Sequence, residues 1–424
     1  MKSTKLNKHL LVGVLLCHVF LQSAFRESAY GVAELGEPRL NPNERIRLET
    51  GMVNGLLVDR YTWRDSAGRP RSASLVRYGQ GAGGYAVQFT YQVQDSLFAS
   101  WRTVYLNPPQ FRGDAGFGYF VSHELYRYFD ATVCPDGSNN CTIAALHGED
   151  DSPLSVYLPG SGRTVSVTTD EAIHEFTLNY PHWGTTIPIA NPNGGDVTPS
   201  HPAFHKKYDL PVTIRWTFTA GRDYPLWSVT YDFRAAPVNT VSADMRGPYG
   251  YLIFDGGING PITALEWGDR YVFKTQGNTV STQSQWTWNT LNQGARYNLL
   301  VAGQYEMGVV ETVPYRMSKL GSGYSDDRGH TSAHGLGCAD AGWRMPCNWE
   351  WPYQSVQYEE FDTRPTRAKK LAWGTAPYMG TDRTSDDMGE PMAGYPVVSY
   401  SVWITFNKSA GTKTRNLATS IRSE

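Results

Sequence analysis

One segment of the sequence gathers side chains that could bind a carboxylate and move a proton. Asp244, Arg246 and Tyr249 lie in "SADMRGPYGYLIFDGG", residues 242–257. A guanidinium binds a carboxylate through two parallel hydrogen bonds, and a phenol held near a base or a cation can transfer a proton. These residue types are those that β-elimination from a uronate requires. The structural alternative is an Asp–Arg ion pair that pins a β-turn beneath the tyrosine.

The same segment is rich in residues that bend the backbone. Gly247, Pro248 and Gly250 follow Arg246 closely and precede the strand candidate "GYLIF". Glycine and proline predict a sharp turn here and a backbone that can approach a ligand closely.

Histidines are concentrated in loop sequences, where function in β-proteins is commonly found. His182 and His201 are the candidate partners of Tyr249 in proton transfer. His201 and His205 lie four residues apart, a spacing that would suit a metal on a helix, but Pro199 and Pro202 argue against a helix there. "GHTSAH" repeats this spacing. For each histidine, a hydrogen-bonded structural role is the alternative. The loop histidines are His147, His182, His201, His205, His330 and His334.

A third cluster is aromatic. "CNWEWPYQSVQYEEFD", residues 347–362, alternates so that one strand face would carry its rings as a sugar-stacking platform, with Glu350 on the other face. Asp244 and the rings are the candidate substrate-binding residues, and a carboxylate pair would instead suit a glycoside hydrolase. The rings of this segment are Trp349, Trp351 and Tyr353, Trp183 of the 180–209 segment is a further candidate substrate-binding ring, and the candidate carboxylates are Asp244, Asp255, Glu350 and Glu359.

Composition favours an all-β protein. The 424 residues include 26 Tyr, 13 Trp and 16 Phe, which favour strands, beside 42 Gly and 25 Pro, which favour turns. Exposed aromatic rings also suit sugar binding, although a buried aromatic core explains most of them. A net charge of −2 argues against a nucleic-acid partner.

Strand-like runs recur along the chain and predict a large antiparallel β-sandwich with long functional loops. The clearest hairpin is "LPVTIRWTFTAGRDYPLWSVTYDF". Two segments, 180–209 and 319–344, are predicted to be the long loops. "SHELYRYF" and "TRAKKLAW" could each form a short helix instead. A single catalytic domain is predicted over residues 30–424, although a division near residue 210 is an alternative.

The N-terminus has the layout of a secretory signal peptide over residues 1–29, with a basic start and a short apolar run. We therefore expect a secreted or periplasmic protein without a membrane span. Apart from Cys17 in this segment, the cysteines form two pairs that are close in sequence. These pairs predict disulfides, and a zinc site is the weaker alternative. The pairs are Cys134–Cys141 and Cys338–Cys347.

The hairpin above and the later "LEWGDRYVF" resemble the galactose-mutarotase-like supersandwich of carbohydrate-active enzymes, over the region from Gly51 to Phe406. The resemblance implies a supersandwich type of β-fold. It transfers no catalytic residue to this sequence.

These observations predict a carbohydrate-active enzyme that cleaves a polysaccharide, preferentially a uronate lyase acting by β-elimination. The alternatives are a glycoside hydrolase and a non-catalytic glycan-binding module. Nucleotide-binding, serine-esterase and zincin motifs are absent from the sequence. No cofactor or catalytic metal is expected, although a structural Ca²⁺ is conceivable. The glycan, its linkage and the oligomeric state are not encoded in any motif.

Overall fold

The computed structural model describes the strand framework of the chain. The described residues are 32–77, 84–107, 116–128, 139, 141–147, 162–182, 189–190, 196–197, 208–235, 240–252, 254, 264–268, 273–275, 297–312, 355–358, 369–375 and 397–422. Strands make up 61% and helices 8% of them, which confirms the all-β class. Within these ranges, no helix is long and apolar enough to cross a membrane.

The first sheet has ten described strands, all paired antiparallel. Its order is β1-β2-β3-β4-β6-β14-β20-β19, with β5 also paired to β4 and β7 to β6. The bounds are β1 Ile46–Val53, β2 Leu56–Arg64, β3 Pro70–Val76, β4 Ala86–Val93, β5 Arg102–Leu106, β6 Gly116–Tyr128, β7 Cys141–His147, β14 Thr240–Leu252, β19 Ser355–Tyr358 and β20 Lys369–Thr375.

The second sheet has nine described strands in the order β16-β15-β17-β18-β21-β13-β12-β9-β8. The bounds are β8 Gly162–Val167, β9 Glu171–His182, β12 Tyr208–Thr219, β13 Leu226–Asp232, β15 Ala264–Gly268, β16 Phe273–Thr275, β17 Tyr297–Ala302, β18 Tyr305–Glu311 and β21 Val397–Lys408. A separate pair, β10 Ile189–Ala190 and β11 Asp196–Val197, and the 3₁₀ turn η2 Phe233–Ala235 complete the strand framework. The predicted β12–β13 hairpin is confirmed, with Trp216 opposite Trp227.

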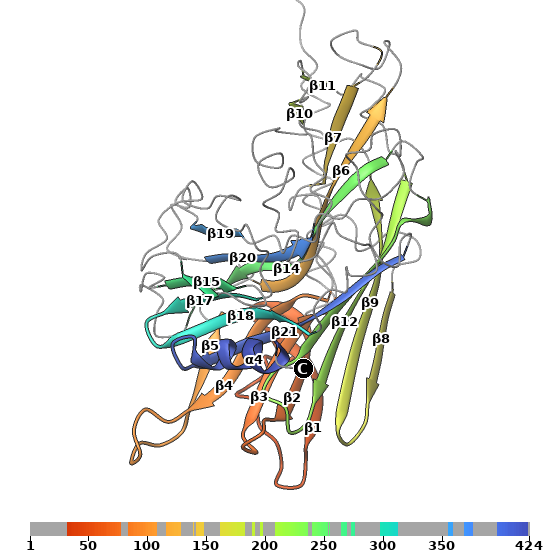
Figure 1. Ribbon diagram of the computed structural model, residues 1–424. Coiled ribbons are helices and arrows are strands. Elements are labelled where there is room, and N and C mark those ends of the chain that lie inside the picture. Colours follow the sequence, from red (N-terminus) through yellow and green to blue (C-terminus); the bar gives the residue numbers. More distant parts are fainter. Residues whose placement is uncertain are drawn as a thin grey trace, which may run out of the picture.

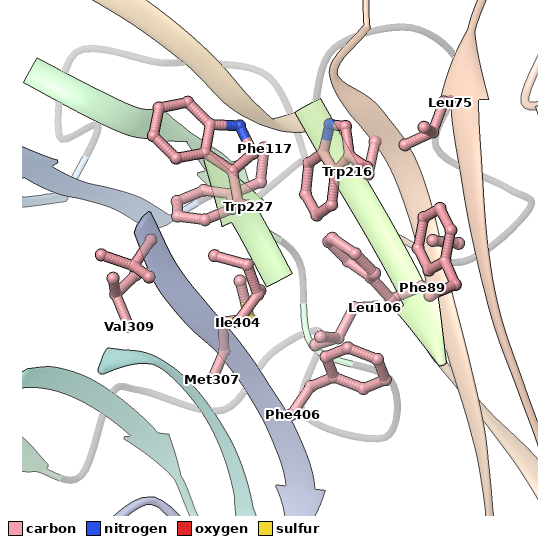
Figure 2. Packing of buried hydrophobic residues seen from close by; sticks show 14 of the residues in the cluster. Leu75, Phe89, Leu106, Phe117, Trp216, Trp227, Met307, Val309, Ile404 and Phe406 are labelled. Carbon is pink, nitrogen blue, oxygen red and sulfur yellow. The ribbon is translucent and has the colours of Figure 1, made fainter. Parts of the chain in front are cut away.

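Side chains from both sheets meet in one core (Figure 2). Phe89 and Phe117 of the first sheet face Trp216 and Trp227 of the second, and all four are fully buried. The indole N–H of Trp216 donates to the Gly84 carbonyl at 2.6 Å, and that of Trp227 donates to the Gly118 carbonyl at 2.8 Å. The two buried indoles therefore keep their hydrogen bonds while joining the sheets, as buried tryptophans require. This arrangement confirms the β-sandwich.

A C-terminal helix, α4 (Thr412–Arg422), covers the outer face of the second sheet near β18 (Figure 1). Leu417, Ala418 and Ile421 pack there against a small cluster that includes Tyr297 and Leu299. The helix was not predicted from the sequence, because only these few apolar residues mark a segment of 11 residues.

Several local expectations change in the structure. "SHELYRYF" lies in β6 up to Tyr128, and the "KKLAW" part of "TRAKKLAW" lies in β20, so neither described part is helical. The ends of the predicted 180–209 loop are strand, because β9 extends to His182 and β12 begins at Tyr208. A hairpin that the analysis overlooked, β1–β2, turns at Asn54–Gly55, both at positive φ. Asn-Gly is a common sequence for such a turn, so the signal was present.

Candidate functional site

The segment that carries Asp244, Arg246 and Tyr249 is a continuous strand with a bulge, and the predicted sharp turn is wrong. β14 pairs with β20 through Arg246↔Gly374 and Tyr249↔Ala372, so the register shifts between these two pairs. Gly247 and Pro248 occupy the bulge. Proline is tolerated in an inner strand at such a place, because a bulged residue need not donate to the ladder.

Gly250 also serves a different purpose from the one expected. A Cβ placed on this residue would overlap the carbonyl oxygen of Gly116 at the start of β6. Its φ of 153° lies in a region that favours glycine. The absence of a side chain at Gly250 therefore lets β6 approach β14 closely. The sequence predicted a close approach at this segment too, but to a ligand rather than to a neighbouring strand.

The bulge places the three candidate positions on one face of the sheet. In the register with β6, Asp244 pairs with His123, Arg246 with Val121 and Tyr249 with Tyr119. The three β6 positions alternate, so they share one face, and their β14 partners share it with them. Without the extra residue of the bulge, Tyr249 would fall on the opposite face.

This face is directed away from the central core. The next register pair along β14 is Gly250↔Phe117, and Phe117 is fully buried in the core. A second register shift separates this pair from Tyr249↔Tyr119, because β6 carries Gly118 as an extra residue there. Tyr249 and Gly250 are consecutive on β14, so their positions lie on opposite faces, and the extra residue on β6 places Tyr119 on the face opposite Phe117 as well. The Asp244–Arg246–Tyr249 row therefore occupies the outer face of the first sheet. We call the positions His123, Tyr119, Asp244, Arg246 and Tyr249 the β6–β14 face.

His123 is a residue of this face that the sequence analysis passed over. The histidines singled out from the sequence lie in or beside loops, whereas His123 stands within a strand pattern. Strand pairing brings it opposite Asp244, although the two are separated by 120 residues of chain. The alternation in "FGYFVSHELYRYF" could have placed His123 and Tyr119 on one face, but it contains no information about the partner strand.

The other predicted site residues are not brought to this face by the described structure. His182 is the last residue of β9 in the second sheet and pairs with Tyr208. His201 and the aromatic residues Trp183, Trp349, Trp351 and Tyr353 lie outside the described residues. Their roles therefore remain predictions.

The remaining sequence predictions fall mostly on the same undescribed regions. Residues 1–29 and Cys134, Cys338 and Cys347 are outside the described ranges, while Cys141 begins β7. The signal peptide and the disulfides stay predictions. Among the described residues, no group of three or more His, Cys, Asp or Glu side chains is placed to hold a metal ion.

A second polar cluster lies inside the sandwich, near its edge. Asp59 of β2 is fully buried and binds Arg163 of β8, with the guanidinium Nε 2.6 Å from Oδ2. Thr50 donates to the other carboxylate oxygen at 2.9 Å, and Arg77 lies 3.7 Å from it. The Asp59–Arg163 pair joins the first sheet to the edge strand of the second. The buried Asp59 carboxylate is therefore compensated by nearby guanidinium groups and is not left as an unpaired charge.

His174 of β9 extends this cluster inward. Its Nδ1 lies 3.0 Å from the Tyr61 hydroxyl and 3.9 Å from Asp59, and its side chain is fully buried. Burial lowers the pKa of His174 to about 4, partly opposed by the charge of Asp59. Burial also raises the pKa of Tyr61 well above its usual range. A neutral imidazole and a neutral phenol without solvent contact stabilise the sandwich, and they are poorly placed to meet a polysaccharide.

Comparisons with known proteins identify no family for this chain. No protein-family model matches the sequence, and no curated protein matches it either. The chain is similar in structure to an alpha-mannosidase from Enterococcus faecalis V583, with TM-score 0.36 and 8% identity, covering 92% of this chain and 33% of that one. A glycosyl hydrolase family 38 protein from Enterococcus faecalis gives TM-score 0.37 and 7% identity, covering 92% and 34%.

A third similarity covers the whole of the other chain. The Slr1438 protein from Synechocystis sp. PCC 6803 gives TM-score 0.34 and 10% identity, covering 88% of this chain and 100% of that one. By contrast, this chain spans about a third of the length of the two Enterococcus proteins. TM-scores at this level carry no argument about function, so the site rests on this chain's own residues.

Proposed function

We propose that the protein is a carbohydrate-active enzyme that cleaves an acidic polysaccharide by β-elimination, with its site on the β6–β14 face. The observation that supports this most is the common face of Asp244, Arg246 and Tyr249, with His123 opposite Asp244. One face thus holds positions for a carboxylate-binding cation, a phenol and an imidazole. Consecutive positions of this row are separated by two ladder steps, about 7 Å, which suits groups that contact one extended ligand.

Each residue type has a distinct part in such a reaction. Arg246 would neutralise the uronate carboxylate, which makes the adjacent C–H more acidic. His123 would remove that proton, and Tyr249 would donate one to the departing glycosidic oxygen. Directly opposed residues have Cβ atoms about 4.5–5.5 Å apart, so Asp244 is suitably placed to orient the imidazole of His123.

The same register offers less to a two-carboxylate hydrolase. Asp244 is the one carboxylate among the described positions of this face, because Glu124 pairs with Ala243 and falls on the other face. Glycosidases of the common type need two carboxyl groups, about 5–9 Å apart. The predicted partners Asp255, Glu350 and Glu359 lie outside the described residues.

The deciding experiment follows two signals on a panel of uronate-containing and neutral polysaccharides. Ultraviolet absorbance reports the double bond that elimination creates, and reducing ends report any chain cleavage. We expect both to rise on an acidic polymer. Reducing ends without absorbance would replace the lyase with a hydrolase, and binding of a glycan without either signal would replace the enzyme with a binding module.

A further inference from the structure

The β4–β5 hairpin ends in a turn that carries apolar side chains. β4 and β5 pair up to Val93↔Arg102, and residues 94–101 close the hairpin. The N–H of Ala99 donates to the Ser96 carbonyl at 3.0 Å, so Leu97 and Phe98 are the central residues of the turn. The hairpin projects from the body of the sandwich at the lower left of Figure 1.

These two side chains are the most exposed large apolar groups among the described residues. Phe98 is 95% exposed and Leu97 80%, whereas Val32, Val167 and Val397 are exposed by 37–42%. Gln94 fixes the conformation of the turn, because its side-chain amide donates to the Leu97 carbonyl at 3.2 Å and to the Ala99 carbonyl at 2.8 Å. An apolar pair held outward in this way marks an interaction site more strongly than a single exposed residue does.

Next to the Leu97–Phe98 tip, towards the body of the sandwich, lie an aromatic ring and a group of cationic side chains. Trp101, 47% exposed, stacks with Arg69, whose guanidinium carbon is 5.1 Å from the ring centre. Arg102 donates to Asp95 at 2.8 Å and to the Tyr305 hydroxyl at 2.7 Å, and Lys408 also pairs with Asp95. Arg69 and Arg71 both pair with Asp65, at 3.0 and 3.5 Å, so four cations stand here against two carboxylates.

We propose that this hairpin docks on a lipid surface, with Leu97 and Phe98 entering the acyl boundary. The order from the tip inward is apolar pair, indole, cations, which is the order of acyl chains, interfacial region and phosphates in a lipid layer. A convex apolar tip can insert into a fluid lipid layer, because the layer deforms around it. The small excess of positive charge predicts only a modest preference for anionic lipid.

The hairpin and the β6–β14 face lie at opposite ends of the first sheet. Ala86 of β4 pairs with Phe117 of β6 in antiparallel register, so from this level the two strands run apart. β4 runs towards Val93 and the hairpin, while β6 runs towards His123 and Tyr128. Docking through the hairpin would therefore leave the β6–β14 face open to a large ligand, and the inference does not depend on what that ligand is.

The test is co-sedimentation of the whole chain with phosphatidylcholine vesicles, with and without phosphatidylglycerol. We expect the wild type to bind both, with a salt-sensitive gain on the anionic vesicles. The double variant Leu97→Ser/Phe98→Ser should bind at least about tenfold more weakly. The control Val397→Ser removes an exposed apolar group elsewhere and should bind as the wild type does.

Unchanged thermal unfolding of both variants would show that the fold is intact, since the replaced side chains are exposed. If the wild type bound neither kind of vesicle, the proposal would be overturned, and a protein partner with a pocket for the apolar tip would be sought instead. Equal binding by the wild type and the double variant would also overturn it, because the contact would then lie elsewhere.

Discussion

His123 and Asp244 are paired residues in the antiparallel register of β6 and β14. This pair lies on the outer face of the first sheet, next to Arg246↔Val121 and beyond it Tyr249↔Tyr119. A carboxylate that hydrogen-bonds one ring nitrogen of a histidine sets which nitrogen carries the proton, so this pairing suits a proton-transferring histidine. It gives the proposed site a base that the sequence did not point to.

Replacing Arg246 tests the carboxylate-binding role. On a substrate that gives an ultraviolet signal, Arg246→Ala should lower kcat/KM about 100-fold, because a charge-stabilising donor is lost. Arg246→Lys should recover only part of this, since an ammonium lacks the two-pronged geometry. The control is Glu124→Gln, on the opposite face of the neighbouring strand, which should keep wild-type activity. Equal losses in Arg246→Ala and Glu124→Gln would remove the site from this face.

The pH dependence of stability reports on His174. The pKa of His174 is about 4 in the folded protein, against 6.5 for an ordinary histidine, so between these pH values the unfolded chain binds the extra proton. The contribution of His174 to the free energy of unfolding should therefore be complete above pH 6.5. The free energy of unfolding should fall by roughly 3 kcal/mol as the pH drops from 6.5 to 4. Chemical denaturation at several pH values measures this slope.

Two variants separate His174 from other titrating groups. His174→Phe should be less stable at neutral pH, because the Tyr61 hydroxyl loses its partner, but its slope between pH 4 and 6.5 should be shallower. Asp95→Asn should keep the wild-type slope there, since Arg102 and Lys408 hold the pKa of Asp95 at about 2, below this window. An unchanged slope in His174→Phe would assign the pH effect to another residue.

Gly118 is required by Trp216, because a Cβ at this position would overlap the indole ring and its φ is 111°. We expect Gly118→Ala to lower the free energy of unfolding by about 3 kcal/mol or more, combining overpacking with backbone strain. Gly221, with φ of 86° and no atom within 4 Å of the added Cβ, isolates the strain alone. Gly221→Ala should cost only about 1 kcal/mol. Equal losses in thermal or denaturant unfolding would show that overlap with Trp216 is unimportant.

Glu306 anchors the start of α4 from β18. Its fully buried carboxylate accepts hydrogen bonds from the Ser409 hydroxyl at 2.7 Å, the Thr414 N–H at 3.2 Å and the Gly411 N–H. Glu306→Ala leaves these donors, of which Gly411 and Thr414 are buried, without an acceptor and should destabilise the protein by about 3 kcal/mol. Hydrogen exchange should then show faster exchange in α4 first.

The matched control for this prediction is Asn416→Ala on the exposed side of the same helix. It removes no contact to Glu306 and should change stability by less than about 0.5 kcal/mol. If Glu306→Ala leaves both the melting temperature and the α4 exchange rates unchanged, the carboxylate does not hold the helix.

The sequence by itself determined the all-β class and the β12–β13 hairpin. Alternation and turn residues are local signals, and they appear in "VTIRWTF" and "LWSVTYDF" without any knowledge of partners. The burial of Trp216 and Trp227 follows from the same alternation. The Asn54–Gly55 turn was equally local, and α4 was missed because a short polar-rich helix gives a weak periodic signal.

Only the tertiary structure decided which strands are neighbours. β6 and β14 pair across more than 100 residues, and no local pattern specifies that His123 stands opposite Asp244. The bulge at Gly247–Pro248 was interpreted from sequence as a turn. Turns and bulges favour the same residue types, and they differ in whether the flanking strands continue the same ladder of hydrogen bonds. Whether Tyr249 shares a face with Arg246 depends on that one extra residue. The residue types of the candidate site were therefore evident in the sequence, whereas their arrangement came from long-range strand pairing.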